Sequence, residues 1–193
     1  MPRLAILGMC FLAAVSTFGQ NGPAISETGA SFRYQLEIAD LSKVNFQEFS
    51  LRVDGKSLKL HRGSFKEFAH GKGGVEVELF NQWVLPSSQG SPNQVLLYFV
   101  QTLIGGSSSQ TAYIQLLSIE NAHLVIKQEF RFIPIDSTHA CDFDSIKGEL
   151  RIIAKSGDAS PAFAPASADQ AFFSLNSGRF IRTGWQTVPT KLP

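Results

Sequence analysis

The chain has 193 residues, with 17 Lys and Arg against 16 Asp and Glu, and a formal net charge of +1. This balance predicts no basic surface, so nucleic acid and anionic lipid are poor candidate partners. Only Cys10 and Cys141 are present, which excludes the small secreted domains that several disulfides hold together. Stability must therefore come from burial, for which the chain offers 16 phenylalanines.

Residues 1–19 have the layout of a secretory signal peptide. Arg3 is followed by an apolar run from Leu4 to Val15 and then by small and polar residues that end at Gly19. The apolar run is roughly 12 residues long and too short to cross a bilayer as a helix. We therefore expect cleavage after Gly19, loss of Cys10 with the signal, and no membrane span afterwards. One remaining cysteine cannot form an internal disulfide, which favours a bacterial periplasmic or secreted protein.

Cleavage leaves about 174 residues, which is enough for one domain with a substantial core. Residues 20–30, "QNGPAISETGA", are rich in turn-forming residues and are predicted to be a flexible lead-in. Residues 31–193 are predicted to form a single β domain.

The predicted strands follow one another along the chain with turn signals between them. Residues 31–39 alternate between apolar and polar side chains, and Asp54-Gly55 predicts a tight hairpin between residues 49–53 and 56–61. Residues 93–104 form a more continuous apolar run, which predicts a strand covered on both faces. The other extended runs are residues 74–85, 111–120, 122–135 and 147–155, followed by a closing hairpin at 170–188 that turns at residues 176–178.

Helical spacing is weak throughout, and residues 40–49 are the best candidate for a short helix. About nine short strands with turns between them predict an all-β fold, a mainly antiparallel sandwich or partly closed barrel. In the strand at 122–135, alternation places five side chains on one apolar face and predicts a polar, solvated face opposite. The apolar face would carry Leu124, Ile126, Gln128, Phe130 and Phe132.

The segment "DSTHACDFDS", residues 136–145, holds the side chains of metal sites and thiol nucleophiles. In an extended chain His139 and Cys141 would project from the same side about 7 Å apart. Zinc needs more ligands than this segment supplies, and Asp142 and Asp144 oppose ionisation of the thiol. We interpret the segment as a polar turn with Cys141 buried beneath the sheet. A weaker hypothesis is a calcium site formed by Asp136, Asp142 and Asp144.

Two other groups of residues are candidates for a functional site. Glu76 and Glu78 would form a carboxylate pair about 7 Å apart on one side of a strand, as in some glycoside hydrolases, although any solvated strand face carries such residues. Trp83, Tyr113 and Trp185 are candidate ligand-binding aromatics, because exposed rings on a sheet form platforms for sugars or proteins.

These observations favour an exported protein that binds a protein or a glycan non-covalently in the cell envelope or outside the cell, with no cofactor and no metal. One alternative is a secreted enzyme, either a hydrolase that uses Glu76 or Glu78 or a thiol- or metal-dependent enzyme centred on Cys141 and His139. Another is a structural subunit without a small ligand, whose Cys141 pairs with a second chain.

Overall fold

The computed structural model describes residues 25–28, 32–38, 40–69, 73–85, 93–105, 108–156 and 167–189. The predicted signal peptide, most of the predicted lead-in and the predicted loops around residues 86–92 and 157–166 lie outside these ranges. Within them the chain is nearly all β and its strands pair antiparallel. The prediction of an all-β, antiparallel, sandwich-like fold is confirmed, and the sheets do not close into a barrel.

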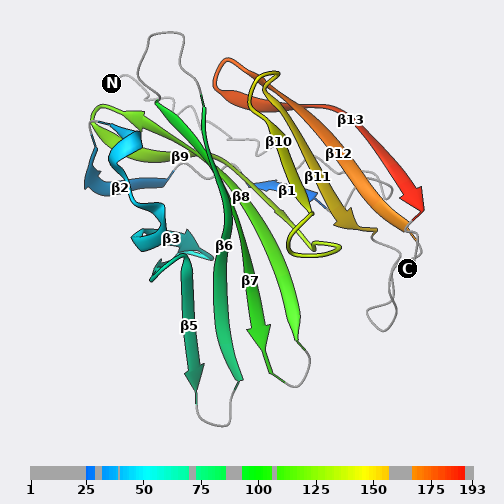
Figure 1. Ribbon diagram of the computed structural model, residues 1–193, viewed down its shortest axis with the longest axis horizontal. Helices are drawn as coiled ribbons and strands as arrows, with labels where there is room; N and C mark the ends of the chain where they lie inside the picture. Colours follow the sequence, from blue (N-terminus) through cyan, green and yellow to red (C-terminus); the bar gives the residue numbers. More distant parts are fainter. Residues whose placement is uncertain are drawn as a thin grey trace, which may run out of the picture.

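Seven strands form the larger sheet, in the order β1-β9-β8-β7-β6-β5, with β2 also paired to β9 (Figure 1). β1 lies within the predicted lead-in and pairs with the end of β9, whereas β2 pairs with its start. The strands are β1 (Ile25–Thr28), β2 (Phe32–Glu37), β5 (Ser64–Ala69), β6 (Gly73–Leu85), β7 (Gln94–Ile104), β8 (Ser109–Glu120) and β9 (His123–Phe132).

Four strands form a second sheet in simple chain order, each joined to the next by an antiparallel pairing. They are β10 (Cys141–Asp144), β11 (Glu149–Lys155), β12 (Ser167–Asn176) and β13 (Arg179–Pro189). The closing hairpin predicted at 170–188 is confirmed as β12 and β13. The predicted turn at 136–145 is a turn only in its first half, because Cys141–Asp144 forms β10.

A small hairpin and two helical turns complete the described chain. β3 (Ser50–Val53) and β4 (Lys56–Lys59) form the hairpin predicted from Asp54-Gly55, and both turn residues have positive φ, 48° and 78°. The residues predicted as a short helix form two 3-10 turns instead, η1 (Leu41–Lys43) and η2 (Phe46–Glu48). Asp40 and Asn45 cap these turns, and caps so close together leave no length for an α-helix.

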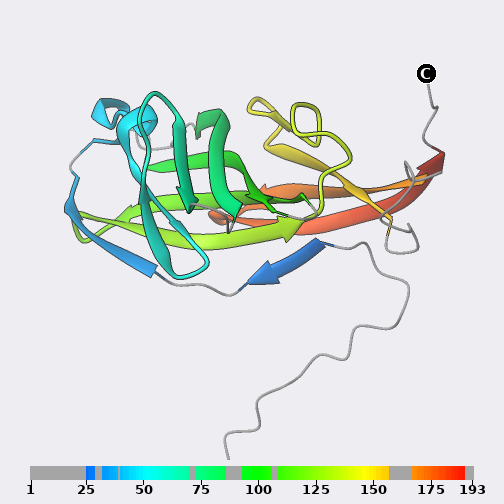
Figure 2. The same cartoon turned by 90° about the horizontal axis from the view of Figure 1, so that it is seen from below.

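The larger sheet is covered on both faces, at different ends of the molecule. Residues 95–100 of β7 are all buried, as their continuous apolar sequence predicted. Leu96, Tyr98 and Val100 pack against the four-stranded sheet, whereas Val95, Leu97 and Phe99 pack against the hairpin and the helical turns. Figure 2 shows the hairpin segment in cyan at one end and β10–β13 in yellow to red at the other. One sheet therefore serves two hydrophobic cores.

The polar, solvated face predicted for β9 is only partly present. A register shift between Leu116 and Leu117 of β8 inserts one extra residue into β9. Leu124 and Ile126 therefore lie in the core beneath the hairpin, while Phe130 and Phe132 lie in the core beneath the four-stranded sheet. The prediction of one continuous apolar face was wrong, because a bulge reverses the alternation of side chains.

Candidate functional site

The four-stranded sheet has one buried face and one open face. Cys141, Phe143, Leu150, Ile152 and Phe173 point into the core between the sheets. Because side chains alternate along a strand, their neighbours form the outer face. Two rows of directly paired residues cross the strands there. One row consists of Asp142, Arg151, Phe172 and Gly184, and the other of Asp144, Glu149, Ser174 and Ile181.

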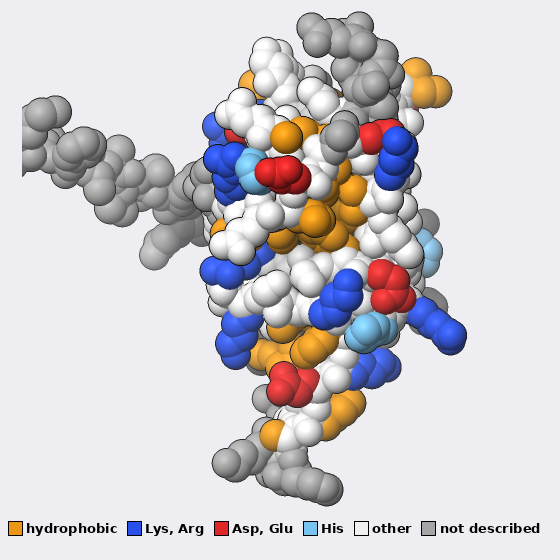
Figure 3. All heavy atoms as spheres, turned by 90° about the vertical axis from the view of Figure 1, so that its left-hand side faces the viewer, with side chains coloured by type: hydrophobic (Ala, Val, Ile, Leu, Met, Phe, Trp, Pro, Cys, Tyr) orange, Lys and Arg blue, Asp and Glu red, His pale blue; other side chains and the backbone are white. Residues whose placement is uncertain are grey.

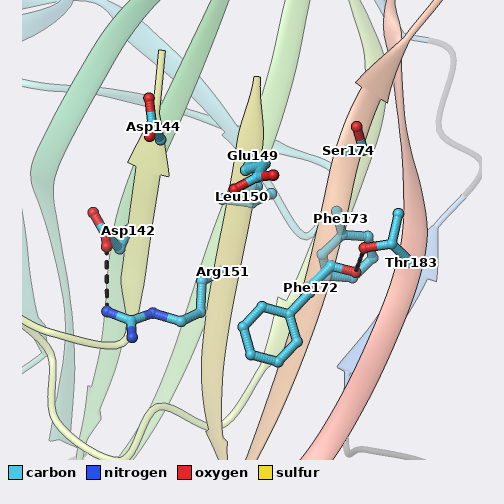
Figure 4. Close-up of a pocket in the computed structure, with 9 residues that line it drawn as sticks. All are labelled: Asp142, Asp144, Glu149, Leu150, Arg151, Phe172, Phe173, Ser174 and Thr183. Carbon is cyan, nitrogen blue, oxygen red and sulfur yellow. Dashed lines mark hydrogen bonds and ion pairs between the residues drawn. The ribbon is translucent and has the colours of Figure 1, made fainter. Parts of the chain in front are cut away.

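These two rows enclose a shallow groove of about 570 Å³ (Figure 4). Arg151 Nη2 lies 3.2 Å from Asp142 Oδ2. The Phe172 ring extends from β12 toward β11. The residues that line the groove are Asp142, Asp144, Glu149, Leu150, Arg151, Phe172, Phe173, Ser174 and Thr183. The groove thus combines an outward-facing aromatic ring with carboxylates, a guanidinium group and two hydroxyls.

A bulge in β13 opens space beside Phe172. The register between β12 and β13 shifts between Phe172 and Phe173, so that Gly184 lies opposite Phe172. A Cβ atom added at Gly184 would meet no atom within 4 Å. Thr183 donates a hydrogen bond to the Phe172 carbonyl at 3.2 Å. The outer face of the sheet therefore has open space at Gly184, opposite Phe172.

The groove carries more negative than positive charge, with three carboxylates against the single guanidinium of Arg151. The backbone amides of Lys147 and Ile146 donate to Asp144 Oδ1 and lower the pKa of that carboxyl. Lys147 Nζ also lies 3.5 Å from Asp144 Oδ2, whereas Glu149 has no ion-pair partner among the described residues. The lining of the groove therefore carries a surplus of negative charge.

His139 and Cys141 do not meet. The Cys141 side chain is buried in the core between the sheets, where desolvation, and secondarily the charge of Asp142, raise the pKa of the thiol well above its usual value. The His139 side chain is 83% exposed, and its Nδ1 lies 3.3 Å from Asp136 Oδ1. This arrangement places the imidazole outside and the thiol inside the sheet.

The three aspartates of the calcium hypothesis have separate local roles. Asp136 Oδ1 accepts hydrogen bonds from the amides of Thr138 and His139 at 2.7 and 3.0 Å. Burial opposes ionisation of Asp136, but these bonds and that of the Thr138 hydroxyl outweigh it and lower the pKa. Asp142 forms an ion pair with Arg151, and Asp144 accepts a hydrogen bond from the Ile146 amide in the turn that follows β10. Within the described ranges, no three His, Cys, Asp or Glu side chains are grouped so as to hold a metal ion.

Glu76 and Glu78 lie on β6, far along the chain from the groove. Glu76 forms an ion pair with Lys66 of β5, whose pKa is raised by the hydrogen bond to Glu76. Glu78 is exposed and lies opposite Ser64 and Val100 on the neighbouring strands. The two carboxylates share a sheet face, and one of them is already paired with a cation.

The three predicted ligand-binding aromatics have different environments. Tyr113 is 1% exposed and stacks on Phe99 with ring centroids 5.1 Å apart. Trp83 is half-buried and packs edge-on against Phe143 between the sheets. Trp185 is 46% exposed on β13, opposite Ala171 and therefore on the other face from the groove. None of the three lines the groove.

Phe172 is the aromatic residue that the sequence reasoning missed. Its signal is the doublet Phe172-Phe173 in a strand. Successive side chains of a strand point to opposite faces, so one of two adjacent phenylalanines must face outward. Phe173 lies in the core, where its ring contacts Phe130, and Phe172 takes the outer face.

A second polar cluster lies at the opposite side of the larger sheet, where the tip of the β3–β4 hairpin meets β8 and β9. Asp54 forms an ion pair with Arg131, and the Tyr113 hydroxyl lies 3.1 Å from Asp54 Oδ2. Burial, and secondarily the charge of Glu129, raise the pKa of Tyr113 to about 12. Gln115 Nε2 donates to the Arg52 carbonyl and to Glu129. This cluster fixes the hairpin to the sheet.

Figure 3 shows the side of the molecule that carries the N-terminal elements. Hydrophobic side chains are visible there in a hollow, with Lys and Arg side chains around it. Apolar residues at the margin of the core beneath the hairpin are only partly buried, and they are Phe32, Val44, Leu58, Phe65, Val75 and Ile119. They pack against the core beneath the hairpin.

Comparison with protein-family models, with curated proteins and with solved structures finds no match to this chain. Within the described ranges, no helix is both long enough and apolar enough to cross a membrane.

Proposed function

We propose that this protein binds a glycan non-covalently through the groove on the outer face of β10–β13. The observation that carries the proposal is the Phe172 ring, which faces outward beside the open space at Gly184. The apolar face of a sugar ring can stack on a phenyl group. Carboxylates, a guanidinium group and hydroxyls around such a ring can accept and donate hydrogen bonds to sugar hydroxyls.

The charge of the groove supports a neutral or amine-bearing glycan. Asp142, Asp144 and Glu149 face a single guanidinium group, that of Arg151. A carboxylated or sulfated sugar would be repelled by this surplus of negative charge, whereas an ammonium group would be attracted. The proposal therefore orders the ligands: amine-bearing and neutral sugars bind more tightly than acidic ones.

The surroundings of the candidate catalytic residues give the enzyme alternatives less support. The buried Cys141 thiol, with its raised pKa, is a poor nucleophile and is also out of reach of a second chain. Glu76 is occupied by Lys66. Asp142 is paired with Arg151. Non-covalent binding in the groove requires neither proton transfer nor covalent chemistry from any of these groups.

A protein ligand is the second candidate, and β13 is the feature that favours it. This strand lies at the edge of its sheet and is 11 residues long. Ile181 and Trp185 on it are 53% and 46% exposed. An edge strand offers backbone groups for strand addition, but the bulge at Phe172/Phe173, together with Arg179 and Arg182, disfavours pairing along its whole length.

Export remains part of the proposal and rests on the sequence of residues 1–19 alone. A glycan in the bacterial envelope or outside the cell is the ligand that such a location would provide.

Calorimetric titration of the purified protein tests the proposal. The ligands are neutral, amine-bearing and carboxylated oligosaccharides, and the variants are Phe172→Ala and Gly184→Leu. Loss of the ring should weaken binding at least about tenfold, which is 1.4 kcal/mol. The Cβ of Leu at position 184 would meet no neighbouring atom within 4 Å. The rest of the Leu side chain should fill the open space and weaken binding as much as the loss of the Phe172 ring does.

Phe68→Ala is the matched control, because Phe68 is also a phenylalanine on a strand and is 61% exposed. It should bind as the unmodified protein does. Equal affinities for the unmodified protein, Phe172→Ala and Gly184→Leu would contradict the proposal, as would a preference for the carboxylated sugars.

A further inference from the structure

Two buried polar atoms without a protein partner border the same carboxylate. Four such side-chain atoms occur among the described residues, and two of them are Gln115 Oε1 and Arg131 Nε. Gln115 lies directly opposite Glu129 across β8 and β9, and Arg131 follows two residues after Glu129 on the same side of β9. A buried polar group without a partner costs about 1–3 kcal/mol, so a native structure rarely leaves two together.

The orientation of the Gln115 amide is fixed by its nitrogen. Gln115 is fully buried. Its Nε2 donates both hydrogens, one to the Arg52 carbonyl at 2.7 Å and one to Glu129 Oε2 at 2.6 Å. If the amide nitrogen and oxygen were exchanged, the amide oxygen would face two other acceptors, the Arg52 carbonyl and Glu129 Oε2. A donor to Gln115 Oε1 would therefore have to be a group other than these two.

Arg131 places a donor near the other carboxylate oxygen of Glu129. Its guanidinium group lies over the Tyr113 ring, 4.9 Å from the centroid, and its Nη2 lies 3.0 Å from the Tyr113 hydroxyl. Arg131 Nε is 3.9 Å from Glu129 Oε1, which is too long for a direct hydrogen bond. A water molecule can bridge two polar groups that are farther apart than about 3.5 Å.

We propose that one ordered water molecule binds between Gln115, Glu129 and Arg131. It accepts a hydrogen bond from Arg131 Nε and donates its two hydrogens to Gln115 Oε1 and Glu129 Oε1. Three hydrogen bonds are the usual number for a buried water, and two such bonds through one oxygen span up to about 5.8 Å. The water would use both of its hydrogens and one lone pair. It would supply a partner for Gln115 Oε1 and for Arg131 Nε, and it would bridge the 3.9 Å contact between Arg131 Nε and Glu129 Oε1.

Gln128 is a matched residue that needs no water. It is buried like Gln115 but lies on β9. Its Oε1 accepts from the Phe180 amide at 2.8 Å, and its Nε2 donates to the Phe180 carbonyl at 2.8 Å. Its remaining hydrogen goes to Glu27. The water site thus distinguishes the core beneath the hairpin from the core between the two sheets.

A crystal structure at a resolution that reveals ordered solvent tests the proposal on the unmodified protein. The expected result is a density peak about 2.7–3.2 Å from Gln115 Oε1, Arg131 Nε and Glu129 Oε1, and no such peak at Gln128 Oε1. A direct hydrogen bond between Gln115 Oε1 and Arg131 Nε, or well-ordered side chains with no peak between them, would overturn it.

Replacement of the amide gives a second arm. Gln115→Met keeps the length of the side chain and removes its strong acceptor, so the density peak should be lost. A solution measurement on the unmodified protein, magnetisation transfer from water to the Gln115 side-chain amide, should show a cross-peak that Gln128 lacks. This second measurement does not depend on whether Gln115→Met folds. Equal cross-peaks at Gln115 and Gln128, or none at Gln115, would contradict the water site.

Discussion

Gln128 joins the two sheets through its side-chain amide. It accepts from the amide and donates to the carbonyl of Phe180, which binds β9 to β13. Gln128→Leu would leave both backbone groups buried without a partner, and we expect the free energy of unfolding to fall by about 2–4 kcal/mol. Denaturant titration measures this. Gln35→Leu, at an exposed position of β2, should change it by less than about 0.5 kcal/mol, and equal effects would contradict the account.

Tyr113 makes the stability of the protein depend on alkaline pH. Burial raises the pKa of its hydroxyl from 10.0 to about 12 in the folded protein, while the unfolded chain releases the same proton near pH 10. A raised folded-state pKa contributes stability that is complete below about pH 10 and is lost as the pH rises toward 12.

Unfolding measured between pH 8 and 12 should therefore show a free energy that falls above about pH 10. Burial also raises the pKa of Tyr34 and Tyr98, so these residues add to the decline. Tyr113→Phe should make the decline shallower. A decline of unchanged steepness in this variant would show that Tyr113 ionises as freely in the folded protein as in the unfolded chain.

At the scale of elements, the β3–β4 hairpin depends on Asp54 twice. The residue takes a left-handed backbone conformation with φ of 48°, and its carboxylate pairs with Arg131 of β9. Asp54→Asn keeps the tolerance for that conformation but loses the ion pair, so we expect a loss of up to about 1 kcal/mol. Asp54→Ala should cost about 1 kcal/mol more, because alanine disfavours positive φ.

Asp142→Asn is the control for these hairpin variants, since it removes an ion pair between more exposed partners, Asp142 and Arg151. Denaturant titration should find it within about 0.5 kcal/mol of the unmodified protein. If Asp54→Asn and Asp54→Ala have the same stability, the backbone conformation of Asp54 contributes nothing and the hairpin depends on the ion pair alone.

The sequence predicted this hairpin and most strands because their signals are local. Asp54-Gly55 favours the turn by itself, and alternation or continuous apolarity marks the strands. The bulges are not local. Register shifts at Leu79/Asn81, Leu116/Leu117 and Phe172/Phe173 arise from pairing with a neighbouring strand. Each one reverses which side chains face the core, so the faces of β9 and β13 could not be predicted from alternation.

The candidate site escaped prediction for a related reason. The groove residues come from four strands and meet only through the register of the sheet. Phe172 could have been found from its doublet with Phe173, but the open space at Gly184 depends on the bulge in the neighbouring strand. Conversely, Glu129 and Arg131 lie on the face of residues 122–135 that alternation predicted to be solvated. They are only partly exposed, because Arg131 pairs with Asp54 of the hairpin and Glu129 accepts a hydrogen bond from Gln115.

At the scale of the whole molecule, the larger sheet couples two cores. Leu96 and Leu97 are adjacent in β7 and fully buried, one in each core. We expect Leu96→Ala and Leu97→Ala each to lower the free energy of unfolding by about 2–5 kcal/mol. Both should retain one cooperative transition, because either core loses its support when β7 detaches.

Leu103→Ala is the matched control on the same strand. Its side chain is 45% exposed, so the loss should stay below about 1 kcal/mol. Two separate unfolding transitions, one sensitive to Leu96→Ala and the other to Leu97→Ala, would show that the cores unfold independently and that the shared sheet does not couple them.

Glycan binding by the outer face of the four-stranded sheet is most directly tested by amide chemical-shift mapping during titration with a neutral oligosaccharide. Binding in the groove should produce saturable shifts that are largest at residues 142–144, 149–151, 172–174 and 183–184, and these shifts should be lost in Phe172→Ala. Saturable shifts centred on Glu76 and Glu78 or on the face shown in Figure 3, or no saturable shifts with neutral or amine-bearing sugars, would contradict it.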